Sequence, residues 1–529
     1  MQTNLDQFLA ANRGFWDAVG VAVPPGGGAI LVDLMHDNQW YLRWNLITAK
    51  YLQLFYGGRI VGLLHHWPSP TVDYRPDFNA ALASSYGIDE ILDLDRVAET
   101  LADQPAMAEF ETVLCAVSAK QGAPLRRALM ALEAPFCRDF GWLAYDTVIR
   151  SNYHATLDRL SDDQQNALRR LYAQGLAIAQ ICGDRGVTRC VLGHIEYLPY
   201  AAIAHQAIRA GGEAYFLWPL VPGTLRVFRD LDSLGQNRDE RFLDLYQDRI
   251  RGRVGRYDPR FQRFMAGFKA KFAGVRGYRN NNQQDGASSD RAAFLGHFRL
   301  DPAKRTVCLF SQALSDAVHA NGPMIFDDFG QWIRATLEQA RAMPEVNVLV
   351  KVHPRERTYS RDGFMQAMIR EFAAFPNIAI LPRTVENAEL IAHCDAGVTV
   401  HGTPGYEMVM QGLDMVIAGQ SRYSGLGICS EPRDADGYFD ALAQPNGTGT
   451  PDSRREAAEL FAYAEFCLMR SPSLLVRPDT ARLPDKHPVW GFEAANLRGV
   501  TVEDDPYFRA LERICDRGEN LIIREDLLA

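Results

Sequence analysis

Two short segments in the second half of the chain carry side chains that could hold a phosphorylated ligand. Residues 351–354 read Lys-Val-His-Pro, and residues 401–407 read His-Gly-Thr-Pro-Gly-Tyr-Glu. Glycines let a phosphate approach the backbone, while Thr403 and the N-terminus of the helix expected to follow it offer donors and a partial positive charge. His353 can hydrogen-bond a phosphate oxygen, and Lys351 can add charge. Together the two segments predict a site for the phosphate of a nucleotide.

Each segment also fits a purely structural role. Residues 402–405 could form an ordinary strand–turn–helix junction, with Glu407 as a favourable acid in the first turn of the helix. Lys351 could lie at the surface of a strand edge, and His353 could be hydrogen-bonded beneath a loop. The nucleotide interpretation therefore depends on whether the two segments meet in the fold.

The elements around both segments alternate as in a doubly wound α/β domain. Short apolar runs, each followed by a stretch with helical periodicity, predict strands at 306–310, 347–352, 378–381, 396–400 and 415–418. Ligands of an open parallel sheet lie at the carboxyl ends of its strands. The same edge should therefore also present Ser311, Gln312 and Asp316 after the first of these strands, and Ser421 after the fifth.

The first half of the chain predicts a second parallel sheet. Apolar runs at 29–34, 59–64, 189–194 and 214–217 read as buried strands with helical segments between them. Residues 96–182 should be mostly helical, with one helix beginning after Ser161. We expect an N-terminal domain over residues 1–280, a polar linker over 281–300, a second α/β domain over 301–442 and a helical tail over 443–529 that packs back on the body.

Composition argues against several classes of protein. Hydrophobic residues make up 47% and charged residues 23%, as in folded globular proteins, and the net charge of −9 argues against nucleic-acid binding. Neither a signal peptide nor a stretch of about 18 apolar residues that could span a membrane is expected. The nine cysteines are scattered without a C-x-x-C pair, which is typical of reduced thiols in the cytoplasm.

Residues 251–279 contain nine Lys or Arg against one acid, Asp258. Four phenylalanines lie at helical spacing in this stretch, at positions 261, 264, 268 and 272. This spacing favours a helix whose phenylalanines pack inward and whose basic residues face solvent. The alternative is peripheral contact with the anionic headgroups of the inner membrane, where a lipid-linked substrate would be found.

Motifs in the second half occur in the same order in the capsule polysaccharide biosynthesis proteins, which this chain resembles from about residue 306 to residue 438. They are Phe-Ser-Gln at 310–312, Ser-Asp-Ala at 315–317, Phe-Asp-Asp-Phe at 326–329, Trp332, Val-Lys-Val-His-Pro at 350–354, Thr-Val-His-Gly-Thr-Pro-Gly-Tyr-Glu at 399–407 and Ser-Arg-Tyr at 421–423. His401 departs from the pattern, because Ser or Asn is more usual there. The resemblance implies an α/β fold of the GT-B type, with two Rossmann-like domains facing across a cleft.

The resemblance also implies an activity. The family includes transferases of 3-deoxy-manno-octulosonic acid (Kdo) that use CMP-Kdo, so we expect a glycosyltransferase that moves Kdo or a related 2-keto-3-deoxy sugar onto a glycan or glycolipid in cell-surface polysaccharide synthesis. Carried over by motif, the nucleotide pocket would comprise His353, Pro354, Gly402, Thr403, Gly405 and Glu407. No metal or cofactor is expected, because the helix N-terminus, Lys351 and His353 would stabilise the departing phosphate.

In proteins of this type the N-terminal domain binds the acceptor and often supplies a catalytic carboxylate. Residues 193–197 read Gly-His-Ile-Glu-Tyr after a predicted strand and are similar to family segments on the acceptor side. Glu196 could act as a general base or as a nucleophile beside a catalytic His353, and a cleft position should raise its pKa. His194 and Asp37 are further acceptor-side candidates.

Other interpretations stay open at this point. Glu196 fits equally well as an acid at the N-terminus of a helix, and Asp33, His36 and Asp37 are rivals for the catalytic role. A GT-B sugar-nucleotide epimerase would share the architecture without needing a glycan acceptor. A non-catalytic assembly protein would keep the nucleotide pocket but turn over no donor.

Overall fold

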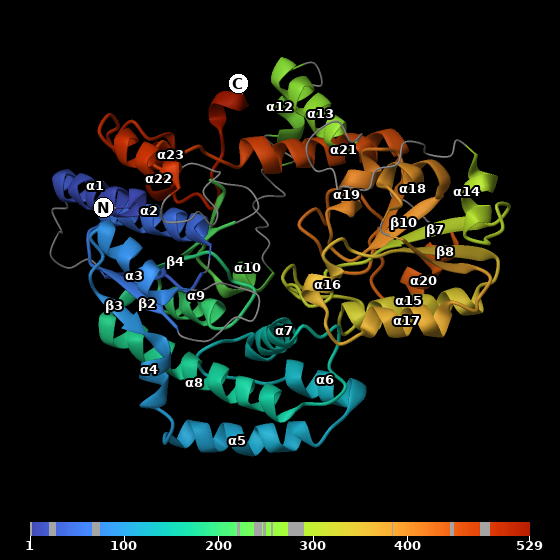
Figure 1. Ribbon diagram of the computed structural model, residues 1–529, viewed down its shortest axis with the longest axis horizontal. Helices are drawn as coiled ribbons and strands as arrows, with labels where there is room; N and C mark the ends of the chain where they lie inside the picture. Colours follow the sequence, from blue (N-terminus) through green and yellow to red (C-terminus); the bar gives the residue numbers. More distant parts are fainter. Residues whose placement is uncertain are drawn as a thin grey trace.

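The computed structural model contains two α/β domains side by side, linked below by a helical insertion and above by helices from the C-terminal part of the chain (Figure 1). It describes residues 3–20, 28–36, 38–65, 75–218, 223–236, 246, 250–254, 258–272, 290–382, 384–444, 449–476 and 487–528. Asp37 and residues 281–289 of the stretch predicted as a linker therefore lie outside the described residues.

The N-terminal domain is built on a six-stranded sheet with the order β3-β2-β1-β4-β5-β6. The strands are β1 (Ala29–Asp33), β2 (Ile60–Leu64), β3 (Ile91–Asp93), β4 (Val187–Leu192), β5 (Glu213–Leu217) and β6 (Leu225–Phe228). All neighbours are parallel except β6, which pairs antiparallel with β5. The unbroken apolar runs correctly predicted β1, β2, β4 and β5, whereas the short edge strands β3 and β6 have too few residues to stand out.

Helices cover both faces of this sheet, so side chains of β1 alternate between two cores. Ile30 and Val32 face a core formed with α1 (Asn4–Val19), α2 (Gln39–Tyr56) and α3 (Pro76–Ser85). Leu31 faces the opposite core, which includes α8 (Asp162–Arg185) and α9 (Tyr200–Arg209). This two-sided burial explains why the strand reads as continuously apolar.

The C-terminal domain has a five-stranded, fully parallel sheet with the order β11-β10-β7-β8-β9. Its strands are β7 (Arg305–Phe310), β8 (Val346–Lys351), β9 (Ile378–Leu381), β10 (Ala396–Thr399) and β11 (Asp414–Ile417). Its main helices are α15 (Phe329–Ala342), α17 (Phe364–Phe372), α18 (Asn387–His393), α19 (Pro404–Val409) and α20 (Ala435–Ala443). The first strand of each domain lies inside its sheet, and later strands are added first on one side of it and then on the other. The order reverses between β1 and β4 in the first sheet and between β7 and β10 in the second, and each of these positions is a strand switch point. These topologies confirm the predicted α/β class with two Rossmann-like domains.

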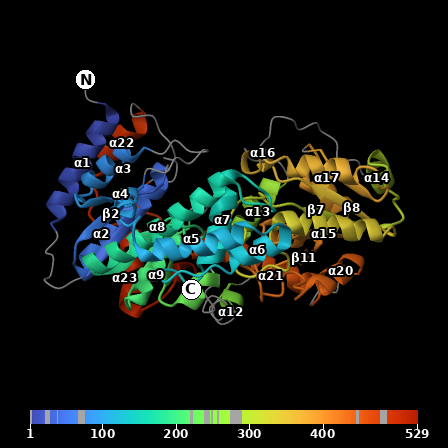
Figure 2. The same ribbon diagram turned by 90° about the horizontal axis from the view of Figure 1, so that it is seen from below.

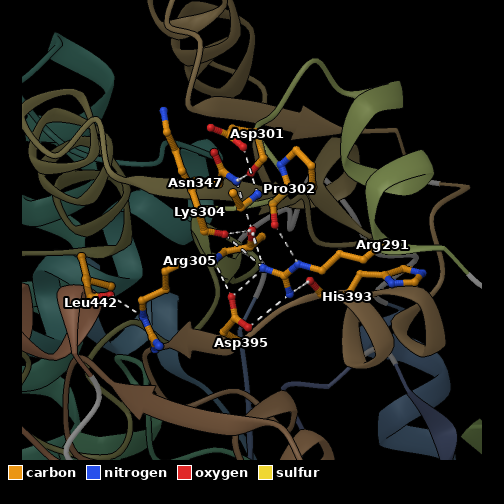
Figure 3. Close-up of polar contacts among 11 residues, drawn as sticks. Arg291, Asp301, Pro302, Lys304, Arg305, Asn347, His393, Asp395 and Leu442 are labelled. Carbon is orange, nitrogen blue, oxygen red and sulfur yellow. Dashed lines mark hydrogen bonds and ion pairs between the residues drawn. The ribbon is translucent and has the colours of Figure 1, made fainter.

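Polar contacts fix the N-terminal edge of the second sheet, the edge opposite to the candidate ligand side chains (Figure 3). Arg291, the first residue of α14 (Arg291–His297), forms an ion pair with Asp395 at 2.8 Å. The same carboxylate accepts from the backbone N–H of Thr306 at 2.7 Å, and Asn347 donates to the loop before β7. The starts of β7, β8 and β10 are thereby held together.

The predicted helical insertion joins the two domains. It consists of α4 (Leu94–Glu99), α5 (Pro105–Ser118), α6 (Gly122–Met130) and α7 (Phe140–Asn152), and it leads into α8. Ser161 caps α8 with the reciprocal hydrogen bonds predicted from the sequence. In both ribbon views α7 lies between the two sheets (Figures 1 and 2).

Buried polar contacts attach α7 to the C-terminal domain. Tyr145 donates to Asp328 at 2.5 Å, and the Asp146 carboxylate lies 2.6 Å from Nδ1 of His319. Burial raises the pKa of Asp328. Burial alone would lower the pKa of His319, but the charge and hydrogen bond of Asp146 raise it. These interactions fix the angle between the domains more sharply than apolar packing would.

The C-terminal part of the chain returns to the N-terminal domain. α21 (Pro451–Tyr463) continues into a π-helical turn (Ala464–Leu468) and crosses between the domains (Figure 1). Beyond it, α22 (Pro488–Asn496) packs on α1, and α23 (Pro506–Arg517) packs on α2. Arg43 of α2 forms an ion pair with Glu493 of α22, and both side chains are almost fully buried.

The described part of the basic stretch forms α13 (Pro259–Phe272). Phe261 and Phe268 are buried, and Phe264 lies 5.4 Å from Tyr463 between ring centroids. For these three phenylalanines the predicted inward packing is confirmed. Among the described helices, none is long and apolar enough to cross a bilayer.

We expect Arg43→Met to destabilise the protein by about 3–5 kcal/mol, because it leaves the Glu493 carboxylate buried without a counter-charge. Urea unfolding followed by tryptophan fluorescence measures the change. The matched control is Arg43→Met combined with Glu493→Met, which removes both charges and should recover most of the loss. A cost below about 1 kcal/mol for the single variant would contradict a buried, charged pair.

Candidate active site between the two domains

The strand switch point of the C-terminal domain brings Ser311 and Gln312 next to the end of β10. Gln312 Nε2 donates to Thr399 Oγ1 at 2.6 Å. A Cβ atom at residue 402 would lie 2.8 Å from the same amide nitrogen, so a larger residue there would push the Gln312 amide away from the turn. Ser311, Gln312 and Gly402 therefore meet as the predicted parallel sheet requires.

Tyr423, in the loop after β11, holds the glycine-containing turn. Its hydroxyl donates to the carbonyl of Gly402 at 2.8 Å. A Cβ atom at Gly405 would overlap this hydroxyl, so Gly405 is needed for packing whether or not a phosphate binds. Ser421, two residues earlier, is buried and its hydroxyl lies 3.2 Å from that of Ser424. Glu407 lies partly buried in the six-residue helix α19.

The end of β8 lies beside this turn through Ser311, whose hydroxyl accepts from the backbone N–H of His353 at 2.8 Å. Nδ1 of His353 accepts from the backbone N–H of Arg355 at 3.2 Å, so Nε2 carries the proton of the neutral ring. Pro354 follows, exposed. Lys351 points its ammonium at the carbonyl of Val385 in the loop after β9, and burial lowers its pKa.

His401, the departure from the family pattern, is an uncharged side chain that is only partly buried. Burial, reinforced by the charge of Arg422, lowers the pKa of His401 to about 4. Its ring packs 5.2 Å from that of Phe329, and Nε2 makes no hydrogen bond within the described residues. A neutral imidazole here adds an uncharged polar atom next to Gly402.

The switch point of the N-terminal domain gathers two carboxylates and two imidazoles. Nε2 of His36 lies 2.6 Å from the buried Asp33 carboxylate, and the His36 ring stacks between Tyr41 and Tyr200. The ring of His194 is 4.9 Å from that of His36. The residues that follow β1 and β4 thus form one cluster rather than two competing sites.

Glu196 is held within this cluster. Its Oε2 lies 3.2 Å from Nδ1 of His194 and accepts from the backbone N–H of Ile195 at 3.0 Å. Burial would raise the pKa of Glu196, but the hydrogen bond and charge of His194 lower it below its ordinary value. The pKa of His194 is correspondingly raised against the effect of burial. The expectation of a raised glutamate pKa was wrong, because it omitted the partner imidazole.

Tyr197 connects the two switch points. Its hydroxyl donates to Asp316 at 3.1 Å and accepts from the backbone N–H of Ala317 at 2.7 Å. Arg150 of α7 also lies 3.6 Å from the Asp316 carboxylate. The sequence marked Asp316 as a ligand candidate and placed Tyr197 in the segment 193–197, but it gave no sign of Arg150 or of these contacts, since the partner comes from another domain.

Arg422 makes a further contact between the domains. It forms an ion pair with Glu465 of the crossing segment at 2.6 Å and lies 3.8 Å above the ring of Trp218, which follows β5. Glu196 also lines a cavity of about 230 Å³ between the domains. The strand ends of both sheets therefore face one cleft.

Replacing Gly405 with alanine should destabilise the C-terminal domain by about 1–3 kcal/mol, because the new methyl group overlaps the hydroxyl of Tyr423. Chemical unfolding monitored by circular dichroism would measure the loss. Adding Tyr423→Ala removes the overlapping oxygen together with the ring carbons that a new methyl group would also overlap, so the double variant should be more stable than the sum of the two single changes predicts. Strict additivity would contradict the packing role of Gly405.

Comparison with protein families gives a match over the C-terminal domain. Residues 281–443 match the model of a family described as capsule polysaccharide biosynthesis protein. Among curated proteins, none matches the sequence.

Several solved structures are similar to the chain at low identity. Thermosulfurimonas dismutans KpsC, beta Kdo 2,4 transferase, is 16% identical with a TM-score of 0.33, over 52% of this chain and 79% of that one. KpsC from the same organism, beta Kdo 2,7 transferase, is 14% identical with a TM-score of 0.31, over 66% and 95%. Anabaena HepE in complex with UDP and glucose is 10% identical with a TM-score of 0.27, over 83% and 95%. The match to the capsule polysaccharide biosynthesis protein family thus covers the part of the chain that holds all five strands of the second sheet, β7 to β11.

Proposed function

We propose that this chain is a glycosyltransferase that moves a sugar from a nucleotide donor to a glycan or glycolipid acceptor in cell-surface polysaccharide synthesis. One observation carries the proposal: the strand switch points of both sheets face the same cleft and touch through Tyr197 and Asp316. Open α/β sheets bind ligands at such switch points. Two of them facing each other provide one place for a donor and one for an acceptor.

The donor side would be the turn at residues 402–405 together with Ser311, Gln312 and His353. The protonated Nε2 of a neutral His353 would donate to the phosphate as negative charge develops on the departing nucleotide. The family resemblance favours a CMP-linked 2-keto-3-deoxy sugar, such as Kdo. The ammonium of Lys351 donates to the carbonyl of Val385, so it would not contact the phosphate directly. Its positive charge would still favour an anion bound nearby.

On the acceptor side we assign catalysis to Glu196. Its lowered pKa keeps it ionised throughout the neutral range, which is the form required of a general base or a nucleophile. His194, 3.2 Å away, would position the carboxylate. Asp33 is fully buried against His36, so it would orient that imidazole rather than meet an acceptor.

We also propose that the protein works in the cytoplasm at the surface of the inner membrane. The nine cysteines are all free, as suits a reducing compartment. Arg251 and Arg263 are exposed beside the packed phenylalanines of α13 and would contact anionic headgroups.

CMP should stabilise the protein against heat, and at one hundred times its Kd the gain should be about 2.7 kcal/mol. A thermal-shift series with CMP, CDP, UDP and GDP measures this. His353→Ala should lower turnover by about 10²–10³ while the melting temperature without ligand stays unchanged, because it removes one donor to developing charge. Stabilisation by UDP or GDP alone would overturn the CMP assignment, and early melting of His353→Ala would indicate a structural histidine.

Glu196→Gln keeps the shape of the side chain and removes its charge, so it should leave CMP binding intact and nearly abolish sugar transfer. Asp33→Asn is the matched control at the other strand end. His194→Ala should raise the pKa of Glu196, because burial then acts without its opposing partner. The acid limb of the pH profile of kcat/KM should therefore move to higher pH.

Near-normal transfer by Glu196→Gln would move the catalytic role elsewhere. The same assay tests the epimerase alternative, because a transferase releases CMP only when a glycan acceptor is present. Formation of a new sugar nucleotide without acceptor and without net release of CMP would favour the epimerase.

A further inference from the structure

The cavity beside Glu196 has walls from both domains. On one side lie Trp142 and Asp146 of α7 and His205 of α9. On the other lie four residues from the loop after β7, namely His319, Ala320, Gly322 and Pro323. Its volume of about 230 Å³ is small beside the roughly 300–1,000 Å³ usual for ligand pockets. It is therefore sized for one sugar ring rather than for a nucleotide.

Trp142 is the most unusual part of the lining. Tryptophan is normally well buried, yet 39% of Trp142 is exposed, and its ring centroid lies 5.2 Å from that of His319. The face of an indole carries partial negative charge and attracts the polarised C–H groups of a pyranose. An exposed indole in a cavity of this size suits a sugar ring.

The polar lining is rich in acceptors and negative in charge. It contains four carboxylates, those of Asp139, Asp146, Glu196 and Asp232, against two cationic side chains. Arg138 lies 3.3 Å from Asp139 and 2.6 Å from Asp232, and the other cation, the buried imidazole at position 319, pairs with Asp146. Burial lowers the pKa of the remaining histidine, at position 205, to about 4, so that ring adds no charge at neutral pH. Carboxylates accept hydrogen bonds from hydroxyl groups but repel a second anion.

We propose that this cavity binds an uncharged pyranose, the acceptor sugar, on Trp142 and excludes acidic sugars. The assignment rests on the proposed glycosyltransferase function and specifies the substrate class of its acceptor side. Glu196 in the cavity wall brings a carboxylate to the hydroxyl groups of a sugar held there. An acidic donor sugar would be kept out of the acceptor position by charge.

Saturation-transfer NMR on the full chain tests this with simple probes. The probes are the methyl glycosides of glucose, galactose, mannose and N-acetylglucosamine, and the methyl glycosides of glucuronic and galacturonic acid at the same concentration. At least one uncharged glycoside should receive saturation, and both uronides should receive little. Trp142→Ala should weaken binding of the uncharged probe by roughly two- to tenfold, whereas Trp142→Phe should keep most of it.

Asp232→Asn gives a second readout, because it removes one carboxylate from the cavity rim and releases Arg138 from an ion pair. This variant should bind uronides better than the wild type does. The assignment is overturned if no uncharged glycoside binds, if uronides bind as strongly, or if Trp142→Ala changes nothing. Thermal stabilisation by CMP, measured on the same samples, separates the cavity assignment from the donor assignment. CMP binding without glycoside binding rejects only the cavity assignment. Glycoside binding without CMP binding rejects only the proposed donor.

Discussion

The arrangement of the candidate site depends on the buried polar contacts between α7 and the C-terminal domain. Tyr145 with Asp328, and Asp146 with His319, join side chains that cannot be left unpaired away from water. Their geometry allows few alternative orientations of the domains. The cleft that follows from this arrangement brings the strand ends of two separate sheets within reach of each other.

Much of this fold could be predicted from local patterns. Strands buried on both faces read as short apolar runs, and all five strands of the C-terminal sheet, with the helices after them, lie where the sequence predicts. Parallel order then implies that Ser311, Gln312 and Gly402 meet at one edge, as they do. Periodicity and topology were sufficient there because each relation is set within a single domain.

Relations between distant segments could not be predicted in this way. The pKa of Glu196 is lowered because His194 lies 3.2 Å away, whereas its cleft position alone suggested a rise. The hydrogen bond from Tyr197 to Asp316, and the cavity beside Trp142, join residues more than a hundred positions apart. No local pattern encodes such pairs, because each member also fits an ordinary role in its own helix or loop.

The central claim is that the donor binds at the switch point of the C-terminal sheet and the acceptor at the switch point of the N-terminal sheet. A crystal structure of the protein with CMP would test this claim most directly. The account predicts the phosphate between the turn at residues 402–405 and the imidazole of His353, with the cavity beside Trp142 left for the acceptor. A nucleotide bound in that cavity, or against His36 on the N-terminal sheet, would contradict it.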